Sequence, residues 1–195
     1  MYPVPCNAED IWYTDTMKIG YNHGRFQPLH NGHFNTLKHI LEHYDELWVG
    51  IANPLRIPVP NMGKLDPKLQ ESLSKAREPE NNPYTYLERY EMVYGALSED
   101  GVDMRRVHIL PHFGFYETDV WTDFIPKGAT IVLFSKDYHH YEKIKVYKDS
   151  GFQLEFIEPL PGVSGSILDK EWPDGNWREL VPKGVVPILE RKIGK

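Results

Sequence analysis

Short apolar runs alternate with longer amphipathic segments along most of the chain. The predicted strands are 18–21, 46–52, 106–110, 130–134 and 153–157. The segments 31–44, 85–97 and 138–150 carry apolar residues at helical spacing and are predicted helices. Because parallel neighbours need a crossover that buries its own apolar stripe, this alternation predicts an α/β fold with an open parallel sheet of about five strands and helices on both faces.

The alternation breaks in two places. Residues 1–16 combine prolines with mixed polarity and are predicted to be a surface extension, to which we assign no chemistry. Residues 54–83 are rich in proline and charge, with a short helix predicted at 67–76. A loop of this length is typical of an active-site lid or a specificity segment, although a solvated insertion remains the alternative. We therefore expect one domain at 17–195 with an insertion at about 54–83.

The composition is that of an ordinary globular protein. With 195 residues, of which 41% are hydrophobic and 26% charged, the chain is long enough for one domain with a sizeable core. Its net charge of -6 argues against a general nucleic-acid binder, which needs a basic face. The single cysteine, Cys6, excludes a disulfide framework and favours the cytoplasm. No apolar run is long enough to predict a membrane span, and the first residues lack a signal-peptide pattern.

The strongest chemical signal is the stretch GRFQPLHNGH at residues 24–33, between the first predicted strand and the first predicted helix. Ligands of open parallel sheets bind at the carboxyl ends of the strands, and the N–H groups of a helix start suit a phosphate. His30 and His33 can donate N–H groups to phosphate oxygens, and Gly32 allows a close approach. The stretch therefore indicates a phosphate-binding turn.

Two other interpretations of these histidines remain open. They could be a packed pair without a ligand, or part of a zinc site completed by His39, His43 or the pair His139–His140. His39 and His43 lie one helical turn apart but lack the glutamate of an HExxH pattern. With 9 His and 15 Gly in the chain, chance predicts only about 0.03 occurrences of H-x-G-H, which favours the phosphate-binding turn.

These residues resemble a known family. GRFQPLHNGH is similar to the (H/T)-x-G-H signature of the nucleotidyltransferase superfamily, and in particular to archaeal-type nicotinamide mononucleotide (NMN) adenylyltransferases. NPYTYLER at 82–89 resembles that family's NPFTxxER, Trp121 falls where the family has a tryptophan against the nicotinamide, and GNWRELVPKGVV at 175–186 resembles its W-x-x-L-V-P-x-x-V-V. The resemblance implies a Rossmann-like fold.

The resemblance also implies a reaction. A phosphorylated acceptor attacks the α-phosphorus of a nucleoside triphosphate and pyrophosphate leaves, so catalysis consists mostly of positioning and charge neutralisation. His30, His33 and Arg25 are then the expected catalytic residues, and Mg²⁺ is expected to bind through the substrate phosphates. The expected nucleotide-binding residues are Gly24, Phe26, Gly32, Ser164, Gly165, Ser166 and Lys170.

The second signature of the family departs from its pattern. Where the family has S-G-T-x-x-R, this chain has SGSILDK at 164–170, so Asp169 stands in the place of the phosphate-binding arginine. An acidic side chain there repels a triphosphate unless Lys170 or Arg56 supplies the missing positive charge.

The acceptor side of the family pattern also differs. Ser135 to His140 replace the family's S-G-N-P, which indicates a different base or acceptor. The expected acceptor-binding residues are Trp121, Arg56, Lys136, Asp137 and Arg89. Glu88, beside Arg89, either acts at the site or is an acidic residue that stabilises the start of a helix.

Three functions compete on this evidence. The first is an NMN-adenylyltransferase-like enzyme that uses ATP, and the second is a CTP-dependent cytidylyltransferase acting on a small phosphonate, as in phosphinothricin-type biosynthesis. The third, motivated by Asp169, is a catalytically impaired nucleotide-binding sensor. The expected partners are ATP or CTP and a small phosphorylated or phosphonate acceptor, without nucleic acid or membrane, and a homo-oligomer remains open.

Overall fold

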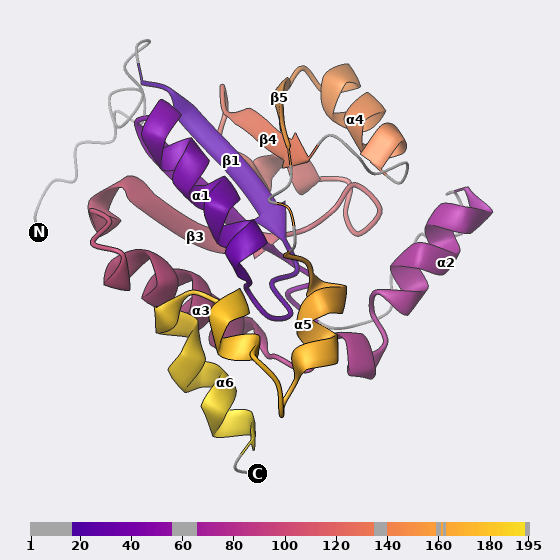
Figure 1. The fold of residues 1–195 in the computed structure, drawn as a ribbon. Helices are drawn as coiled ribbons and strands as arrows, with labels where there is room; N and C mark the ends of the chain where they lie inside the picture. Colours follow the sequence, from indigo (N-terminus) through magenta and orange to yellow (C-terminus); the bar gives the residue numbers. More distant parts are fainter. Residues whose placement is uncertain (1–16, 56–65, 135–139, 159–160, 162, 194–195) are drawn as a thin grey trace, which may run out of the picture.

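The computed structural model describes residues 17–55, 66–134, 140–158, 161 and 163–193. The strands are β1 (Ile19–Gly24), β2 (Glu46–Ala52), β3 (Val107–His112), β4 (Thr130–Phe134) and β5 (Gln153–Ile157). They form one parallel sheet in the order β3-β2-β1-β4-β5 (Figure 1). The predicted five-stranded parallel α/β fold is therefore confirmed, because every predicted strand is present and every pairing is parallel.

The helices follow the strands along the chain. They are α1 (Asn31–His43), α2 (Pro67–Lys75), α3 (Tyr86–Glu99), α4 (His140–Asp149), α5 (Gly165–Glu171) and α6 (Val186–Ile193). Short 3-10 helices are η2 (Pro79–Asn81), η3 (Met104–Arg106), η4 (Trp121–Phe124), η5 (Trp177–Leu180) and η6 (Lys183–Val185). Within the described ranges, no helix combines the length and apolarity needed to cross a bilayer.

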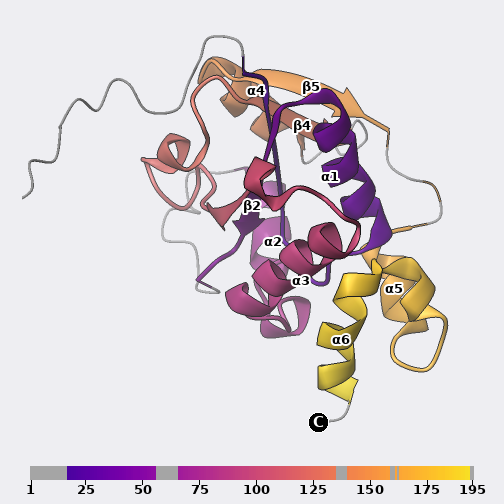
Figure 2. The ribbon, with the colours of Figure 1, turned by 90° about the vertical axis from the view of Figure 1, so that its left-hand side faces the viewer.

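Alternation along the strands creates two separate apolar layers. On one face, Val49 and Val132 pack with residues of α1, α3, α6 and the buried Trp177. On the other face, Tyr21 and Ile131 pack with residues of η4 and α4. Figure 2 shows α3 and α6 side by side on the same side of the sheet as α1. Helices thus cover both faces, as the apolar pattern predicts.

Several elements differ from the predicted boundaries by one to three residues. β1 continues past the predicted apolar run to Gly24, because Asn22 donates a hydrogen bond to the carbonyl of Val132 in β4 and so stays in the sheet despite its polarity. In the predicted insertion, α2 starts at Pro67 after the N-cap Asp66 and packs Leu69 and Leu73 against Tyr116. The segment 56–65 lies outside the described residues.

Candidate active site

A cavity of about 400 Å³ opens at the carboxyl ends of β1, β2, β3 and β4, between α2 and α4. This end of a parallel sheet is where ligands of open α/β folds bind, and the volume lies in the range of small-molecule sites. Its polar lining includes His23, Arg25, His33, Asn53, His112, Lys143 and Tyr147. We therefore take this cavity as the candidate active site.

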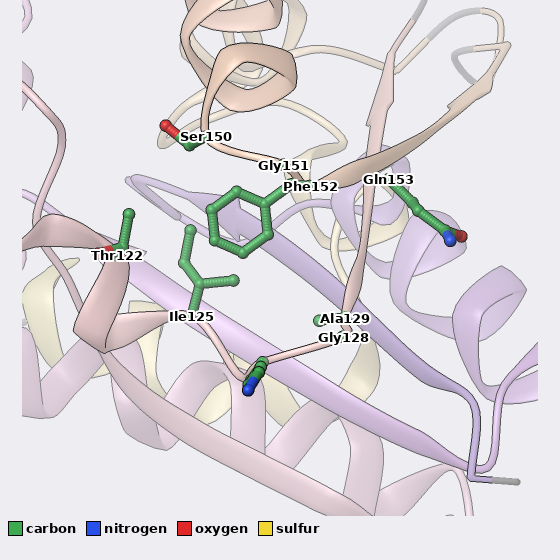
Figure 3. Close-up of a pocket in the computed structure, with 9 residues that line it drawn as sticks. Thr122, Ile125, Gly128, Ala129, Ser150, Gly151, Phe152 and Gln153 are labelled. Carbon is green, nitrogen blue, oxygen red and sulfur yellow. The ribbon is translucent and has the colours of Figure 1, made fainter. Parts of the chain in front are cut away.

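A second cavity, of about 390 Å³, lies at the opposite end of the sheet, where β4 and β5 begin (Figure 3). The side chains of Ile125 and Phe152 lie close together on its wall. Lys127 is the single charged residue among the described residues that line it. This cavity has no convergent polar groups of the kind that fix a substrate.

His30 and His33 build the turn between β1 and α1. His30 is the N-cap of α1, and its Nδ1 accepts hydrogen bonds from the backbone N–H groups of Gly32 and His33 at 3.1 and 3.4 Å. The Nδ1 of His33 accepts one from the backbone N–H of His30 at 3.5 Å, which completes a capping box. The two imidazoles stack with their centroids 3.8 Å apart.

These hydrogen bonds fix the tautomer of both rings. A neutral imidazole that accepts at Nδ1 carries its hydrogen on Nε2. Burial lowers the pKa of His30 to about 4; burial, and then the charges of His30 and Arg25, hold the pKa of His33 well below its usual value. Both rings are therefore neutral near pH 7 and present Nε2–H donors, and His33 lines the cavity.

Arg25 connects the cavity to the segment that follows α2. Its Nη1 donates hydrogen bonds to the carbonyls of Ala76 at 3.0 Å and Asn81 at 3.3 Å. Burial lowers the pKa of its guanidinium, whereas the neighbouring Tyr116 and Asp169 raise it. An arginine stays protonated under such shifts, so Arg25 supplies a positive charge at the cavity wall.

Gly24 and Phe26 shape the backbone of this turn. Phe26 adopts a positive φ of 50°, and its buried ring packs edge-on against His33 with centroids 5.2 Å apart. A Cβ on Gly24 would lie only 3.0 Å from that ring. A side chain at position 24 would therefore push the Phe26 ring against the imidazole that lines the cavity.

Arg89 is fully buried and organises the loops beneath the cavity. Its guanidinium donates to the carbonyls of Arg25, which follows β1, of Ala52, the last residue of β2, and of Asn53, which follows β2. Its neighbour Glu88 caps α3 through Thr85 and pairs with Lys192 at 2.9 Å. Arg89 does not belong to the described cavity lining, so the structure places it under the site, whereas the sequence predicted an acceptor contact.

Two other segments that resemble the family, 82–89 and 175–186, form hydrogen bonds with the same turn. Gln27 exchanges hydrogen bonds with the backbone of Tyr84, at 2.9 and 3.0 Å. Asn31 donates to the carbonyl of Glu179 in η5 at 2.8 Å, and the neighbouring Trp177 is fully buried in the core. The segments 82–89 and 175–186 therefore meet the first turn in space.

The start of α5 lies against the start of α1. The backbone carbonyl of Val163 lies 3.3 Å from the position that a Cβ on Gly32 would occupy. Ser164 caps α5 through the N–H of Ile167, its hydroxyl also bonds Ser166 at 3.0 Å, and Gly165 is the first helical residue. Asp169 and Lys170 are both exposed. The cation that replaces the missing arginine stays a prediction.

Of the five expected acceptor residues, the structure describes Trp121 and Arg89. Trp121 is 7% exposed and packs against Phe115, Tyr147 and Phe152 in the second apolar layer, and it is absent from the described cavity lining. Arg56, Lys136, Asp137 and His139 lie outside the described residues.

The remaining histidines of α1 have local partners. His39 and His43 stack with centroids 4.2 Å apart, and Nε2 of His39 lies 2.7 Å from Glu155. Over the part of the chain that the structure describes, no group of three or more His, Cys, Asp or Glu could hold a metal ion. The geometry at these two residues is that of an ion-paired helix face.

A third pair of stacked imidazoles was not predicted from the sequence. His23 at the end of β1 and His112 at the end of β3 stack with centroids 4.2 Å apart and planes within 7°. The Tyr21 hydroxyl lies 2.7 Å from Nδ1 of His112, and the Tyr147 hydroxyl lies 2.8 Å from Nε2 of His23. The available signal was a histidine at the carboxyl end of each of two predicted parallel strands.

Comparison with known proteins gives consistent matches. Residues 21–56 match the cytidylyltransferase-like family model. A nicotinamide-nucleotide adenylyltransferase of Saccharolobus solfataricus is 28% identical over 187 residues, which cover 90% of this chain and 92% of that protein. A phosphonoformate cytidylyltransferase of Streptomyces viridochromogenes is 33% identical over 177 residues, which cover 88% of this chain and 90% of that protein.

A solved structure shares the fold. A bifunctional NMN adenylyltransferase/ADP ribose pyrophosphatase of Francisella tularensis superposes with a TM-score of 0.65 at 19% identity. The match covers 92% of this chain but 50% of that chain, so this chain spans about half of its length.

Proposed function

The chain belongs to the cytidylyltransferase-like family of nucleotidyltransferases, and from this membership we propose that it transfers a cytidylyl group from CTP to a small phosphonate. The observation that carries the choice of acceptor is the position of Trp121. In the NMN adenylyltransferases that the sequence resembles, a tryptophan at this place packs on the nicotinamide. Here Trp121 is buried among Phe115, Tyr147 and Phe152 and is absent from the described cavity lining, whose side chains include three imidazoles and an ammonium group.

The proposed transfer needs little proton chemistry. An ionised phosphonate oxygen attacks the α-phosphorus of CTP, a new P–O bond forms, and the bond to the bridging oxygen breaks as pyrophosphate leaves. The Nε2–H groups of His30 and His33 stabilise the negative charge that accumulates on the α-phosphate oxygens. Because both rings are neutral, they donate hydrogen bonds without competing for the proton of an acceptor.

The same turn binds the triphosphate chain. The backbone N–H groups at the start of α1 carry the positive end of the helix dipole, and Arg25 adds a full charge beside them. On triphosphate binding we expect Arg25 to exchange its bonds to the Ala76 and Asn81 carbonyls for phosphate oxygens. A hydrogen bond to an anionic oxygen is stronger than one to a neutral carbonyl.

Mg²⁺ fits this site as a substrate-bound ion. The described cavity wall is rich in nitrogen donors, which suit phosphate oxygens, whereas Mg²⁺ prefers oxygen ligands and keeps several waters. We expect the ion to be held by the phosphates of CTP. When bound it neutralises phosphate charge, and orientation of the nucleotide is left to His30, His33 and Arg25.

A second candidate is adenylyl transfer to NMN, which the identity with the Saccharolobus solfataricus protein favours. A third is a nucleotide sensor without turnover, which the exposed Asp169 favours, because its charge lies close enough to Arg25 to raise the pKa of that guanidinium.

Pyrophosphate release separates these candidates. CTP and ATP are each combined with phosphonoformate and with NMN in the presence of Mg²⁺. We expect CTP with phosphonoformate to be the fastest pair, and preference for ATP with NMN would establish the second candidate instead. Nucleotide binding without pyrophosphate release from any pair would contradict an enzymatic function. His33→Gln is the control, because it should slow every active pair alike.

A further inference from the structure

The stacked pair of His23 and His112 depends on a glycine in the strand between them. β2 separates β1 from β3 in the sheet, and Gly50 of β2 lies opposite His23 of β1. A Cβ on Gly50 would overlap the Tyr21 hydroxyl and would lie 2.8 Å from the Cβ of His112. The side chains of β1 can therefore cross β2 and reach His112 only because residue 50 has no side chain.

The hydrogen bond from Tyr21 determines which nitrogen of His112 is free to donate. Tyr21 is fully buried, and burial holds its pKa well above the usual range, so the hydroxyl keeps its hydrogen. Among the described residues its hydrogen-bond partner is Nδ1 of His112, so the hydroxyl donates and Nδ1 accepts. The hydrogen of His112 then sits on Nε2, and His112, only 3% exposed, lines the cavity.

A positive charge from α4 lies at the same end of the cavity. Lys143 lines the cavity together with His23, His112 and Tyr147. Burial first, and the charge of Lys143 second, lower the pKa of His112 to about 3, and both residues line the cavity. A neutral N–H donor beside an ammonium group suits a small anion, because the two supply a directed hydrogen bond and a net charge.

We propose that His112 and Lys143, with His23 stacked on His112, form the binding site for the anionic head group of the acceptor. This inference rests on the proposed function and names the residues that select its acceptor. His33 lines the same cavity, so an acceptor held at His112 shares that cavity with an α-phosphate held at His33. The acceptor is a small phosphonate, and one of its carboxylate or phosphonate oxygens accepts from Nε2 of His112.

The test is direct binding of phosphonoformate. Calorimetric titration is carried out on the full chain saturated with a CTP analogue whose α and β phosphorus atoms are joined by a methylene bridge. The first variant is the double substitution Tyr21→Phe/His112→Phe, because replacing both partners of a buried hydrogen bond by apolar groups of the same shape is nearly neutral for folding. The second is Lys143→Met, which leaves the sheet untouched. His108→Phe is the control, because His108 lies on the same strand but stacks on Trp48 away from the cavity lining.

We expect both test variants to weaken phosphonoformate binding by about 10-fold or more, while the analogue binds as before and His108→Phe behaves as wild type. Absence of binding to the wild-type protein, or unchanged binding in either test variant, would overturn the inference. Pyrophosphate release with CTP is measured in parallel. Binding that depends on His112 without any turnover would contradict the proposed reaction alone, whereas turnover with unaltered binding would contradict the acceptor site alone.

Discussion

At the scale of single residues, the proposal gives His30 two tasks, one for each nitrogen of its ring. Nδ1 caps α1, and we propose that Nε2 donates to a phosphate. Serine, threonine, aspartate and asparagine are the usual N-cap residues. A histidine in this position is explained by a requirement for a second donor at the helix start, and the two tasks can be separated by substitution.

Substitution of His30 should separate folding from catalysis. His30→Ala removes the cap and the phosphate donor, so we expect a loss of about 1 kcal/mol in the free energy of unfolding and a fall in kcat of roughly 100- to 1,000-fold. His30→Asn restores a capping oxygen, so stability should return while kcat stays low. Urea denaturation and pyrophosphate release measure the two effects, and recovery of kcat in the asparagine variant would show that capping alone is the role of His30.

At the scale of elements, Arg89 couples three segments of the fold. It lies in α3 and donates to carbonyls at the carboxyl ends of β1 and β2 and just beyond them, so one buried guanidinium fixes two loops at the carboxyl edge of the sheet. An acceptor-binding arginine would direct these donors into the cavity. In this structure they are occupied by the backbone that forms the cavity floor.

Replacement of Arg89 should therefore act on stability. In Arg89→Met the buried carbonyls lose their donor, and we expect the free energy of unfolding to fall by roughly 3 kcal/mol. Arg89→Lys should recover only part of this loss. Its ammonium group still donates hydrogen bonds, but it lacks the planar fork that reaches the separated carbonyls. A methionine variant of wild-type stability with a raised KM for the acceptor alone would support the sequence-based prediction of an acceptor contact.

The strands and the first turn could be predicted because their signals are local. Runs such as TIVLF at 130–134 and LWVGI at 47–51 each contain enough apolar residues to define a strand without reference to the rest of the chain. That His23 meets His112 cannot be predicted from the sequence around either residue. It depends on the strand order and on the β2–β3 register, in which His112 lies opposite Ala52, and a shift by one residue would turn His112 to the other face.

The position of Trp121 illustrates the same limit. Its spacing along the chain fits the family pattern, but whether an indole faces a cavity or a core depends on what packs around it. Tyr147 from α4 and Phe152 from the start of β5 enclose it here, and neither neighbour can be identified from the sequence near residue 121.

At the scale of the whole molecule, three histidines with lowered pKa values make stability depend on pH. Burial lowers the pKa of His30 to about 4 and that of His112 to about 3, and it holds the pKa of His33 well below its usual value. In the unfolded chain these groups titrate near pH ~6.5. Below that pH these histidines bind protons in the unfolded chain but not in the folded protein. Their contribution to the free energy of unfolding is therefore fully present above pH ~6.5 and is lost as the pH falls toward their folded-state pKa values.

This dependence can be measured as a slope. Between pH ~6.5 and 5 each such histidine should lower the free energy of unfolding by up to about 1.4 kcal/mol per pH unit. Urea denaturation at several pH values measures this slope. In the double variant Tyr21→Phe/His112→Phe the free energy of unfolding should depend less steeply on pH, by the contribution of one histidine. A slope identical to that of the wild-type protein would contradict the neutral, buried state assigned to His112.

The proposed reaction transfers the nucleotidyl group, with the α-phosphate, to the acceptor. It is tested with CTP labelled with ³²P at the α-phosphate or at the γ-phosphate, each incubated with phosphonoformate and Mg²⁺. We expect the α label in the acceptor product and the γ label in pyrophosphate. Transfer of the γ label to the acceptor, or its release as orthophosphate, would contradict nucleotidyl transfer at the turn built by His30 and His33.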